Sequence, residues 1–338
     1  MTTMKAIQVS EANAPFELVE REIPVPGAGE VRIRVEACGI CHSDAFVKTG
    51  SFPGLAFPRV PGHEVAGTID LLGPAVSKWA VGMRVGVGWH GGHCGYCPSC
   101  RRGDFVTCQN QKIAGISYDG GYAQYMVAPQ EALASIPDEL SAVDAAPLLC
   151  AGITTFNALR NSGARPGDVV AVQGVGGLGH LAIQYAARMG FKTVAISGSG
   201  DKRDLALELG AAVYVDASQE DPVAVLQALG GASLILTTAP DARTMAAVID
   251  GLGVGGELLI LGAVAETFEV SPFQLLLARR SIRGWPSGTP DDSEDAMRFT
   301  ALTGSRALIE TYPLEQAEAA YARMINNEAR FRVVLTMD

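Results

Sequence analysis

Four cysteines lie close together in a segment rich in glycine, proline and arginine. Cys94, Cys97, Cys100 and Cys108 follow the spacing C-x2-C-x2-C-x7-C. Four thiolates at this spacing can enclose a Zn2+ ion in a tetrahedron that has no open coordination position. The segment therefore predicts a structural zinc site. An iron–sulfur cluster uses the same four ligands, and metal analysis would distinguish the two.

A glycine-rich turn has the composition of a dinucleotide-binding site. The run Gly174-Val175-Gly176-Gly177-Leu178-Gly179 follows a strand expected over residues 169–173 and precedes a helix expected over residues 180–189. The first glycine of such a motif permits the tight turn, the second lets the backbone approach a pyrophosphate, and the third lets helix and strand pack closely. Because strand, glycines, helix and a second strand occur in this order, the run predicts nicotinamide dinucleotide binding.

The residues after the second strand favour a phosphorylated dinucleotide. The position that contacts the adenosine ribose is expected about 20 residues after the turn, at Ser197. An acidic side chain there would repel a 2′-phosphate, whereas Ser197 and Ser199, followed by Lys202 and Arg203, can accept one. We therefore expect NADP(H) rather than NAD(H). Two alternatives stay open, because Asp201 could turn back to the ribose and Lys202 could face solvent.

Composition and charge exclude several classes of protein. A chain of 338 residues is longer than an ordinary domain with a single hydrophobic core. Its content of 48% hydrophobic and 18% charged residues indicates a globular protein. A net charge of -10 would repel a nucleic-acid backbone. The chain has neither an apolar run of about 18 residues nor an export signal at its start, so we expect no membrane partner. We expect the protein in the cytoplasm. Its seven cysteines are then expected to be reduced or metal-bound rather than paired in disulfides.

The order of the expected elements indicates two domains. Short β-rich segments extend to about residue 130, and strands and helices alternate from about residue 144 to residue 261, which indicates βαβ units and a parallel sheet. After about residue 287 the alternation is lost, and we expect this tail to return to the β-rich half. The predicted fold class is α/β. Its two domains are a discontinuous β-rich domain, residues 1–150 and 288–338, and a doubly wound Rossmann domain, residues 151–287.

A second group of possible metal ligands comes from distant parts of the chain. Its members are Cys41, His63, Glu64 and Cys150. A catalytic zinc requires three protein ligands and a fourth position left to water or substrate. Single buried cysteines and histidines are more often core residues, so residue types alone do not establish this site.

Several motifs follow one another along the chain around this group of possible ligands. The segment Gly62-His63-Glu64-x2-Gly67-x5-Gly73-x2-Val76 follows the segment CGICHSD at residues 38–44, and both precede the four cysteines and the glycine-rich turn. Over nearly the whole chain this order resembles that of the zinc-dependent medium-chain alcohol dehydrogenases. Within that family, the pattern is most similar to the bacterial and yeast-type alcohol dehydrogenases and to the cinnamyl-alcohol-dehydrogenase-like branch. The resemblance implies a GroES-like catalytic domain, two zinc ions per chain, and a homodimer or homotetramer.

The resemblance also implies roles for individual residues. Cys41, His63 and Cys150 would hold the catalytic zinc, with Glu64 behind it and able to replace water transiently. Asp44 would accept the ring N–H of His63 and fix its tautomer. The other implied contacts are a proton bridge at Ser43, cofactor contacts at His42, Thr154 and Arg332, and substrate contacts at Phe52 and Trp89, although either ring could equally be a core residue.

One position departs from the family pattern. Family members commonly carry a histidine five residues after the first zinc cysteine, at the end of a proton relay, and this chain has Phe46 there. Because a phenyl ring cannot carry a proton, the route from Ser43 must run through the ribose hydroxyl to water or through another group.

The predicted function is that of a zinc-dependent oxidoreductase. It would transfer a hydride between NAD(P)(H) and a primary alcohol or aldehyde of aromatic or medium-chain type. Polyol, threonine and formaldehyde dehydrogenases are alternatives on the same scaffold. An alternative of another class is a non-catalytic zinc or nucleotide-binding module, which one zinc ion per chain would favour. Residues 284–288 are a candidate hinge, and residues 255–261 with 273–278 are a candidate subunit interface.

Overall fold

Strand β3 (Glu30–Ile40) is the centre of a seven-stranded sheet, in which it pairs with three other strands. In its first half Val31 and Ile33 are buried and Arg34 is exposed, the alternation expected of a strand with one face in the core. From residue 37 onward every residue of β3 is buried. The strand therefore enters the protein interior just before Cys41.

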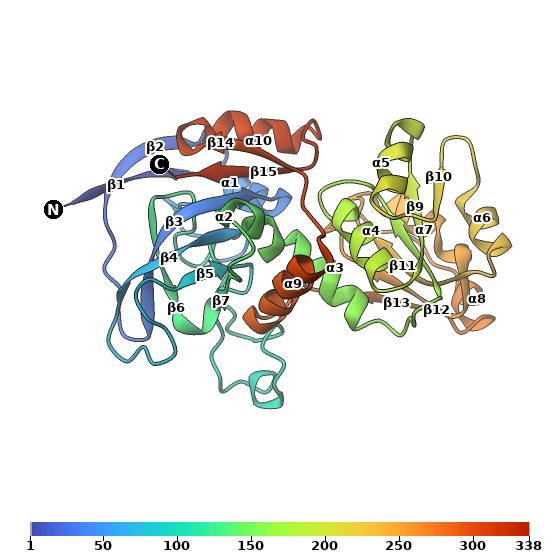
Figure 1. Cartoon of the computed structure of the whole chain (residues 1–338), viewed down its shortest axis with the longest axis horizontal. Helices are drawn as coiled ribbons and strands as arrows, with labels where there is room; N and C mark the ends of the chain where they lie inside the picture. The colour runs from blue at the N-terminus through green and yellow to red at the C-terminus, as the bar shows by residue number, and fades with distance from the viewer. Residues whose placement is uncertain (1, 338) are drawn as a thin grey trace. The chain divides into compact units, whose positions relative to one another are not determined.

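The computed structural model describes residues 2–337, which divide into two units. Unit 1 is formed by the chain up to Ile153 and from Ser287 onward, and unit 2 is formed by Thr154–Pro286. Strand β15 (Arg332–Thr336) pairs antiparallel with β3, and Figure 1 shows the red strand beside the blue one. The tail of the chain therefore lies in the β-rich unit.

Unit 1 contains two sheets. The larger has the strand order β14-β15-β3-β4-β5-β7, with β6 also paired to β3, and the smaller is the antiparallel pair β1-β2. The remaining strand bounds are β1 (Thr3–Gln8), β2 (Glu17–Glu22), β4 (Val65–Leu72), β5 (Arg84–Val87), β6 (Tyr125–Pro129), β7 (Leu133–Ser135) and β14 (Ile309–Pro313). The α-helices are α1 (Ala45–Thr49), α2 (Ala142–Ala145), α9 (Pro290–Thr303) and α10 (Ala317–Ile325), and α3 (Ala151–Arg160) continues into unit 2.

Unit 2 is a six-stranded parallel sheet in the order β10-β9-β8-β11-β12-β13. Its strands are β8 (Val169–Gln173), β9 (Lys192–Ser197), β10 (Val213–Asp216), β11 (Ala232–Thr237), β12 (Leu252–Ile260) and β13 (Ser281–Gly284). Its helices are α4 (Gly179–Arg188), α5 (Arg203–Glu208), α6 (Pro222–Ala228), α7 (Ala242–Ala247) and α8 (Pro272–Leu276). In chain order the strands run 3-2-1-4-5-6, the arrangement of doubly wound dinucleotide-binding sheets. The predicted α/β fold class, with a β-rich part and a doubly wound sheet, is confirmed.

The strand expected over residues 169–173, the helix expected after the glycine-rich turn and the alternation of strands and helices that follows all occur in the structure. The tail also contains two helices that were not predicted, α9 and α10, which precede β15. Helix α9 begins at a capping box, in which Thr289 accepts the N–H of Asp292 and the Asp292 side chain accepts the N–H of Thr289.

Within the described part of the chain, no single helix has both the length and the apolar character needed to cross a membrane. One pair of helices bent by 55°, Ala142–Leu149 with Ala151–Arg160, meets these criteria jointly by length and composition.

Candidate active site

The ligands proposed for a catalytic metal lie together in unit 1. One side-chain ligand atom from each of Cys41, His63, Glu64 and Cys150 lies within 4.8 Å of the others. The sulfur atoms of Cys41 and Cys150 are 3.7 Å apart although 109 positions separate the two residues. The fold therefore assembles one compact group of two thiols, an imidazole and a carboxylate.

Pairing of β3 with β4 accounts for much of this assembly. Cys38 pairs with Val65, so the residue that follows β3 and the two that precede β4 are brought to the same end of the sheet. The N–H of Gly39 donates to the carbonyl oxygen of Glu64 at 2.9 Å. A Cβ at Gly39 would overlap the Glu64 carboxylate, so glycine is required at that close approach.

A buried carboxylate orients the ligand group. Asp44 Oδ1 lies 3.1 Å from His63 Nδ1, and Asp44 Oδ2 accepts the backbone N–H of Cys41 at 2.8 Å and the hydroxyl of Tyr122 at 2.9 Å. Nε2 of His63 is buried and has no hydrogen-bond partner among the described residues. An imidazole held through one nitrogen, with the other nitrogen free beside two thiols, has the arrangement of a metal ligand.

Glu64 is held from behind by Arg332, which is 4% exposed. The guanidinium donates to the carbonyl oxygen of Ile40 at 3.2 Å and forms an ion pair with Oε1 of Glu64. Oε2 of Glu64 is buried and has no hydrogen-bond partner in the described part of the chain. The structure therefore places Arg332 against Glu64, and its implied contact with a cofactor phosphate stays a prediction.

The site residues have strongly shifted pKa values. Burial raises the pKa of Glu64 to about 7, against the opposing effect of Arg332. A hydrogen bond from Cys150, supported by His63, lowers the pKa of Cys41 well below its ordinary value, and the same pairing raises the pKa of Cys150. Burial opposes a charge on His63, but Asp44 and Cys41 leave the pKa of that ring well above its ordinary value. Such a site concentrates negative charge on sulfur, which suits Zn2+.

The four-cysteine segment forms a second group of close sulfur atoms. The ligand atoms of all four residues lie within 4.8 Å of one another. Backbone N–H groups also point at the sulfurs, such as that of Cys97 at the sulfur of Cys94, at 3.4 Å. Hydrogen bonds from Asn110 and backbone amides outweigh burial and lower the pKa of Cys94 to about 6. Four sulfurs without a further ligand in the group fit a closed zinc site.

Aromatic rings extend from the candidate metal ligands. The rings of His63 and Trp89 meet edge to face with centroids 5.0 Å apart. Trp89 contacts Phe52 at 6.2 Å, and Phe52 contacts Phe46 at 5.9 Å. All three aromatic side chains are only partly buried. The two predicted substrate contacts thus belong to an aromatic row that also contains Phe46.

The structure also describes the remaining residues to which the family resemblance gives a role in the reaction. Ser43 and His42 belong to the short 3-10 helix His42–Asp44, where Ser43 is partly exposed and His42 is exposed. Thr154 lies in α3 and is buried. Tyr122 was not predicted, and no motif or spacing in the sequence distinguishes it.

The glycine-rich turn of unit 2 joins β8 to α4. Gly174 has a φ of +99°, and Thr238 donates its hydroxyl to the carbonyl oxygen of Gly174 at 3.0 Å. A Cβ at Gly176 would meet no atom within 4 Å, so the backbone there faces open space. The turn follows β8, where the strand order reverses towards β11, which is the usual position of a dinucleotide in such sheets.

The residues expected at the adenosine ribose lie after β9, whose last residue is Ser197. Lys202 reaches back to the turn, where Nζ donates to the carbonyl oxygen of Val175 at 3.0 Å. Arg203 stacks on Tyr214, with 5.0 Å between the guanidinium carbon and the ring centroid. The hydroxyl of Ser199 bonds to Asp201. Asp201 therefore contacts Ser199, and Lys202 contacts the turn.

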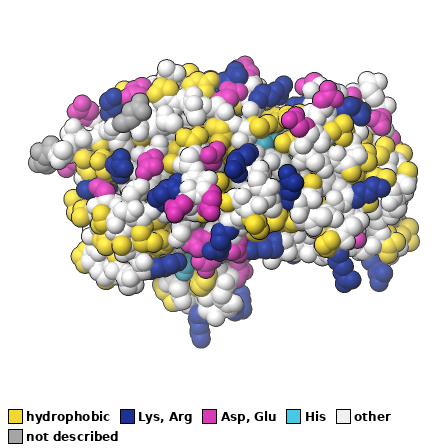
Figure 2. All heavy atoms as spheres, viewed as in Figure 1, with side chains coloured by type: hydrophobic (Ala, Val, Ile, Leu, Met, Phe, Trp, Pro, Cys, Tyr) yellow, Lys and Arg dark blue, Asp and Glu magenta, His cyan; other side chains and the backbone are white. Residues whose placement is uncertain are grey.

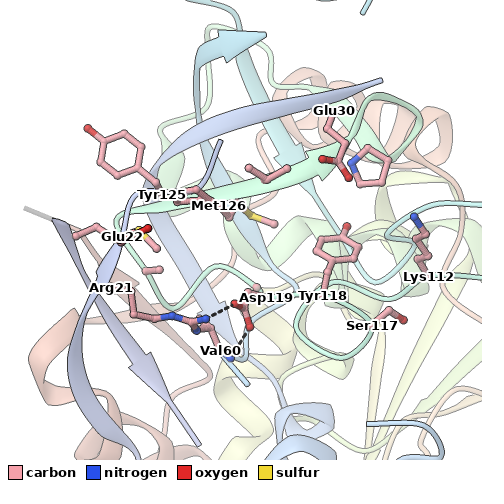
Figure 3. Close-up of a pocket in the computed structure, with 16 residues that line it drawn as sticks. Arg21, Glu22, Glu30, Val60, Lys112, Ser117, Tyr118, Asp119, Tyr125 and Met126 are labelled. Atoms are coloured by element: carbon pink, nitrogen blue, oxygen red, sulfur yellow. Dashed lines mark hydrogen bonds and ion pairs between the residues drawn. The ribbon is translucent and has the colours of Figure 1, made fainter. Parts of the chain in front are cut away.

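A cavity of about 310 Å3 in unit 1 is lined by none of these residues. Figure 3 shows Arg21 beside Asp119, an ion pair of 3.0 Å, with Tyr118 and Lys112 on another side of the cavity. Basic and acidic side chains both line it, and no member of the two groups of clustered metal ligands does.

Comparisons with known proteins identify the family of this chain. Residues 27–138 match the model of the alcohol dehydrogenase GroES-like domain, and residues 177–301 match that of the zinc-binding dehydrogenases. The alcohol dehydrogenase patD of Penicillium expansum is 47% identical over 336 residues, which cover 99% of this chain and 98% of that protein.

Two solved structures have the same fold. A cinnamyl alcohol dehydrogenase of Sorghum bicolor is 28% identical, with a TM-score of 0.89 and coverage of 99% of this chain and 98% of that one. A CAD of Helicobacter pylori, complexed with NADP(H), is 26% identical, with a TM-score of 0.88 and the same coverage of both chains. The predicted family and enzyme class are thus confirmed, and the chain belongs to the zinc-dependent medium-chain alcohol dehydrogenase family.

Proposed function

We propose that this enzyme interconverts primary alcohols and aldehydes of aromatic or medium-chain type, with Cys41, His63 and Cys150 as the ligands of a catalytic zinc. The observation that carries the proposal is the buried Nε2 of His63, which has no hydrogen-bond partner within residues 2–337 and lies beside two sulfurs 3.7 Å apart. When bound there, zinc supplies Lewis-acid polarisation of a substrate oxygen.

The residues around that site have separate tasks. Asp44 accepts the Nδ1–H of His63, which leaves the lone pair on Nε2 directed at the ligand group. Glu64, held by Arg332, provides a carboxylate behind the thiols. Ser43 would receive the proton of the alcohol. Because Phe46 cannot pass that proton on, its exit is through the cofactor ribose or water.

The row Trp89, Phe52 and Phe46 supports the aromatic or medium-chain substrate. Aromatic rings bind apolar substrates through large contact areas and edge-to-face geometry, and they exclude water from the reacting carbon. A short polar substrate would gain little from them. We therefore favour such alcohols over polyols, threonine and formaldehyde.

The test of this proposal combines metal analysis with a substrate panel. We expect two zinc ions per chain, one for each ligand group. Nicotinamide absorbance should show higher kcat/KM for benzylic, allylic and medium-chain alcohols than for ethanol, threonine or a polyol. One zinc per chain, or turnover confined to polyols, threonine or formaldehyde, would contradict the proposal.

We expect NADPH to be preferred over NADH. Lys202 and Arg203, with the hydroxyls of Ser197 and Ser199, support a 2′-phosphate site, and hydrogen bonds to charged groups are worth about 1.5–3 kcal/mol, or about ten- to a hundredfold in kcat/KM. The measurement is kcat/KM with each reduced cofactor, for the wild type and for Lys202→Ala. The variant should lose most of the preference, and a wild type that favours NADH would refute the assignment.

The domain and subunit assignments are part of the same proposal. Residues 1–150 and 288–338 would form the catalytic domain, and residues 151–287 the dinucleotide-binding domain. A homodimer or homotetramer is supported by apolar side chains of unit 2 that are mostly exposed in the single chain, namely Val254, Phe273, Leu276 and Leu277.

Figure 2 shows acidic and basic side chains interspersed on the visible face of unit 1, without the basic field that nucleic acid needs. Cytoplasmic location stays a prediction.

A further inference from the structure

We propose that Tyr122 is a positioning residue for the catalytic ligand group, which it orders through Asp44. This inference rests on the proposed zinc site of Cys41, His63 and Cys150. The Tyr122 side chain is completely buried, and its hydroxyl donates to Oδ2 of Asp44 at 2.9 Å. The same carboxylate contacts His63 through its other oxygen.

Asp44 needs a second side-chain partner for a geometric reason. Rotation about the bond to a carboxylate is soft, so the plane of Asp44 is set by what its two oxygens contact. Three groups contact the two oxygens of Asp44. The ring of His63 contacts Oδ1, and the N–H of Cys41 and the hydroxyl of Tyr122 donate to Oδ2. Since Asp44 is 1% exposed, solvent has little access to replace a lost donor.

The backbone of Tyr122 is held on two sides, and its ring packs against the segment before His63. Its backbone N–H donates to Pro61 at 3.0 Å, and its carbonyl oxygen accepts the N–H of Ile7 at 2.8 Å. A Cβ at Gly62, where φ is +103°, would come within 2.5 Å of the Tyr122 ring. Gly62 directly precedes His63, so the ring packs against the same segment that carries the imidazole. The hydroxyl is therefore fixed relative to both Asp44 and His63.

The hydroxyl acts only as a donor to Asp44. Burial and the charge of Asp44 raise the pKa of Tyr122 well above its ordinary value, so the phenol keeps its proton. Asp44 can then use Oδ1 for the Nδ1–H of His63 while Oδ2 is occupied by the two donors. Loss of the phenol leaves Oδ2 with the Cys41 amide alone and lets the carboxylate rotate.

The experiment compares Tyr122→Phe with the wild type in the zinc-loaded and the cobalt-substituted enzyme. Removing a direct hydrogen-bond partner of a metal ligand typically costs ten- to a hundredfold in affinity or activity, and for a group one step further away we expect about three- to tenfold. One of the two zinc ions should therefore be lost to a chelator about three- to tenfold faster, with an altered visible cobalt spectrum. The release rate of the other zinc should not change.

Two further variants make the test specific. Tyr118→Phe is the matched control, because it removes a hydroxyl that donates to the carbonyl oxygen of Gly91 at 3.0 Å and does not touch Asp44. It should leave both release rates unchanged. In an Asp44→Asn background, Tyr122→Phe should add little to the release rate, because both changes act on the same contact.

The possible outcomes are distinguishable. An unchanged release rate and cobalt spectrum in Tyr122→Phe would overturn the positioning role, as would a general loss of thermal stability without a selective effect on one metal. Full additivity with Asp44→Asn would also overturn it. A wild-type enzyme that holds only the four-cysteine zinc would instead overturn the proposed function, and the positioning role with it.

Discussion

Replacement of Cys41 by serine should lower kcat/KM for every alcohol by at least about a thousandfold and remove one of two zinc ions per chain. A serine hydroxyl stays protonated near neutral pH, whereas the pKa of Cys41 is well below its ordinary value through its hydrogen bond with Cys150 and the nearby His63. The lost Lewis acid stabilises transition-state charge by several kcal/mol, and each 1.36 kcal/mol is tenfold in rate. Initial rates and metal analysis of the purified variant measure both effects.

The control for this variant is Cys38→Ala. Cys38 is buried in strand β3, three positions before Cys41, but it belongs to neither group of clustered ligands. Its sulfur instead faces the carbonyl oxygen of Gly39 at 3.7 Å. Cys38→Ala should keep two zinc ions and most of the activity. A Cys41→Ser enzyme that turned over at a normal rate would rule out the ligand assignment.

Local spacing made part of the site predictable from the sequence. The four cysteines between residues 94 and 108 form a site within one segment, so their separation alone limits what they can bind. The glycine-rich turn is likewise local, because strand, turn and helix are consecutive in the chain. In both cases the chemistry follows from residues that are neighbours before the chain folds.

The catalytic group could not be derived in this way. Its geometry depends on the pairing of Cys38 with Val65 and on the approach of Cys150 from a segment 109 positions from Cys41. Residue types made these residues candidates, and only the resemblance to a family assigned them to one metal site. Tyr122 illustrates the remaining limit, since it reaches Asp44 across 78 positions and no motif marks it.

The missed helix α9 had a recognisable signal. Thr289 is followed by Pro290 and, three positions after Thr289, by Asp292, a capping box with proline in the first turn. Helix α9 lies outside the alternation of strands and helices, because the strands that follow it, β14 and β15, belong to the sheet of unit 1. Arg332 and Glu64 show the opposite case, because both residues were identified from the sequence and their ion pair was not predicted.

The second large effect is expected at the dinucleotide turn. Gly176→Ala should raise the KM for the cofactor about ten- to a hundredfold and leave the melting temperature almost unchanged. The added methyl would meet no protein atom within 4 Å, so the fold can accept it. In this motif the second glycine is the place where the backbone approaches the pyrophosphate, so the methyl would occupy space that the cofactor needs. Fluorescence titration with NADPH and a thermal scan measure the two quantities.

Gly179→Ala separates cofactor contact from folding. Its Cβ would overlap the carbonyl oxygen of Gly174, an atom that cannot move without distorting the turn between β8 and α4. Overpacking of this kind costs about 1–3 kcal/mol, and the melting temperature should fall by about 3–10 °C together with cofactor affinity. If Gly176→Ala also lowered the melting temperature by that amount, its effect on KM would be structural. If both variants bound NADPH normally, the dinucleotide would lie elsewhere in the protein.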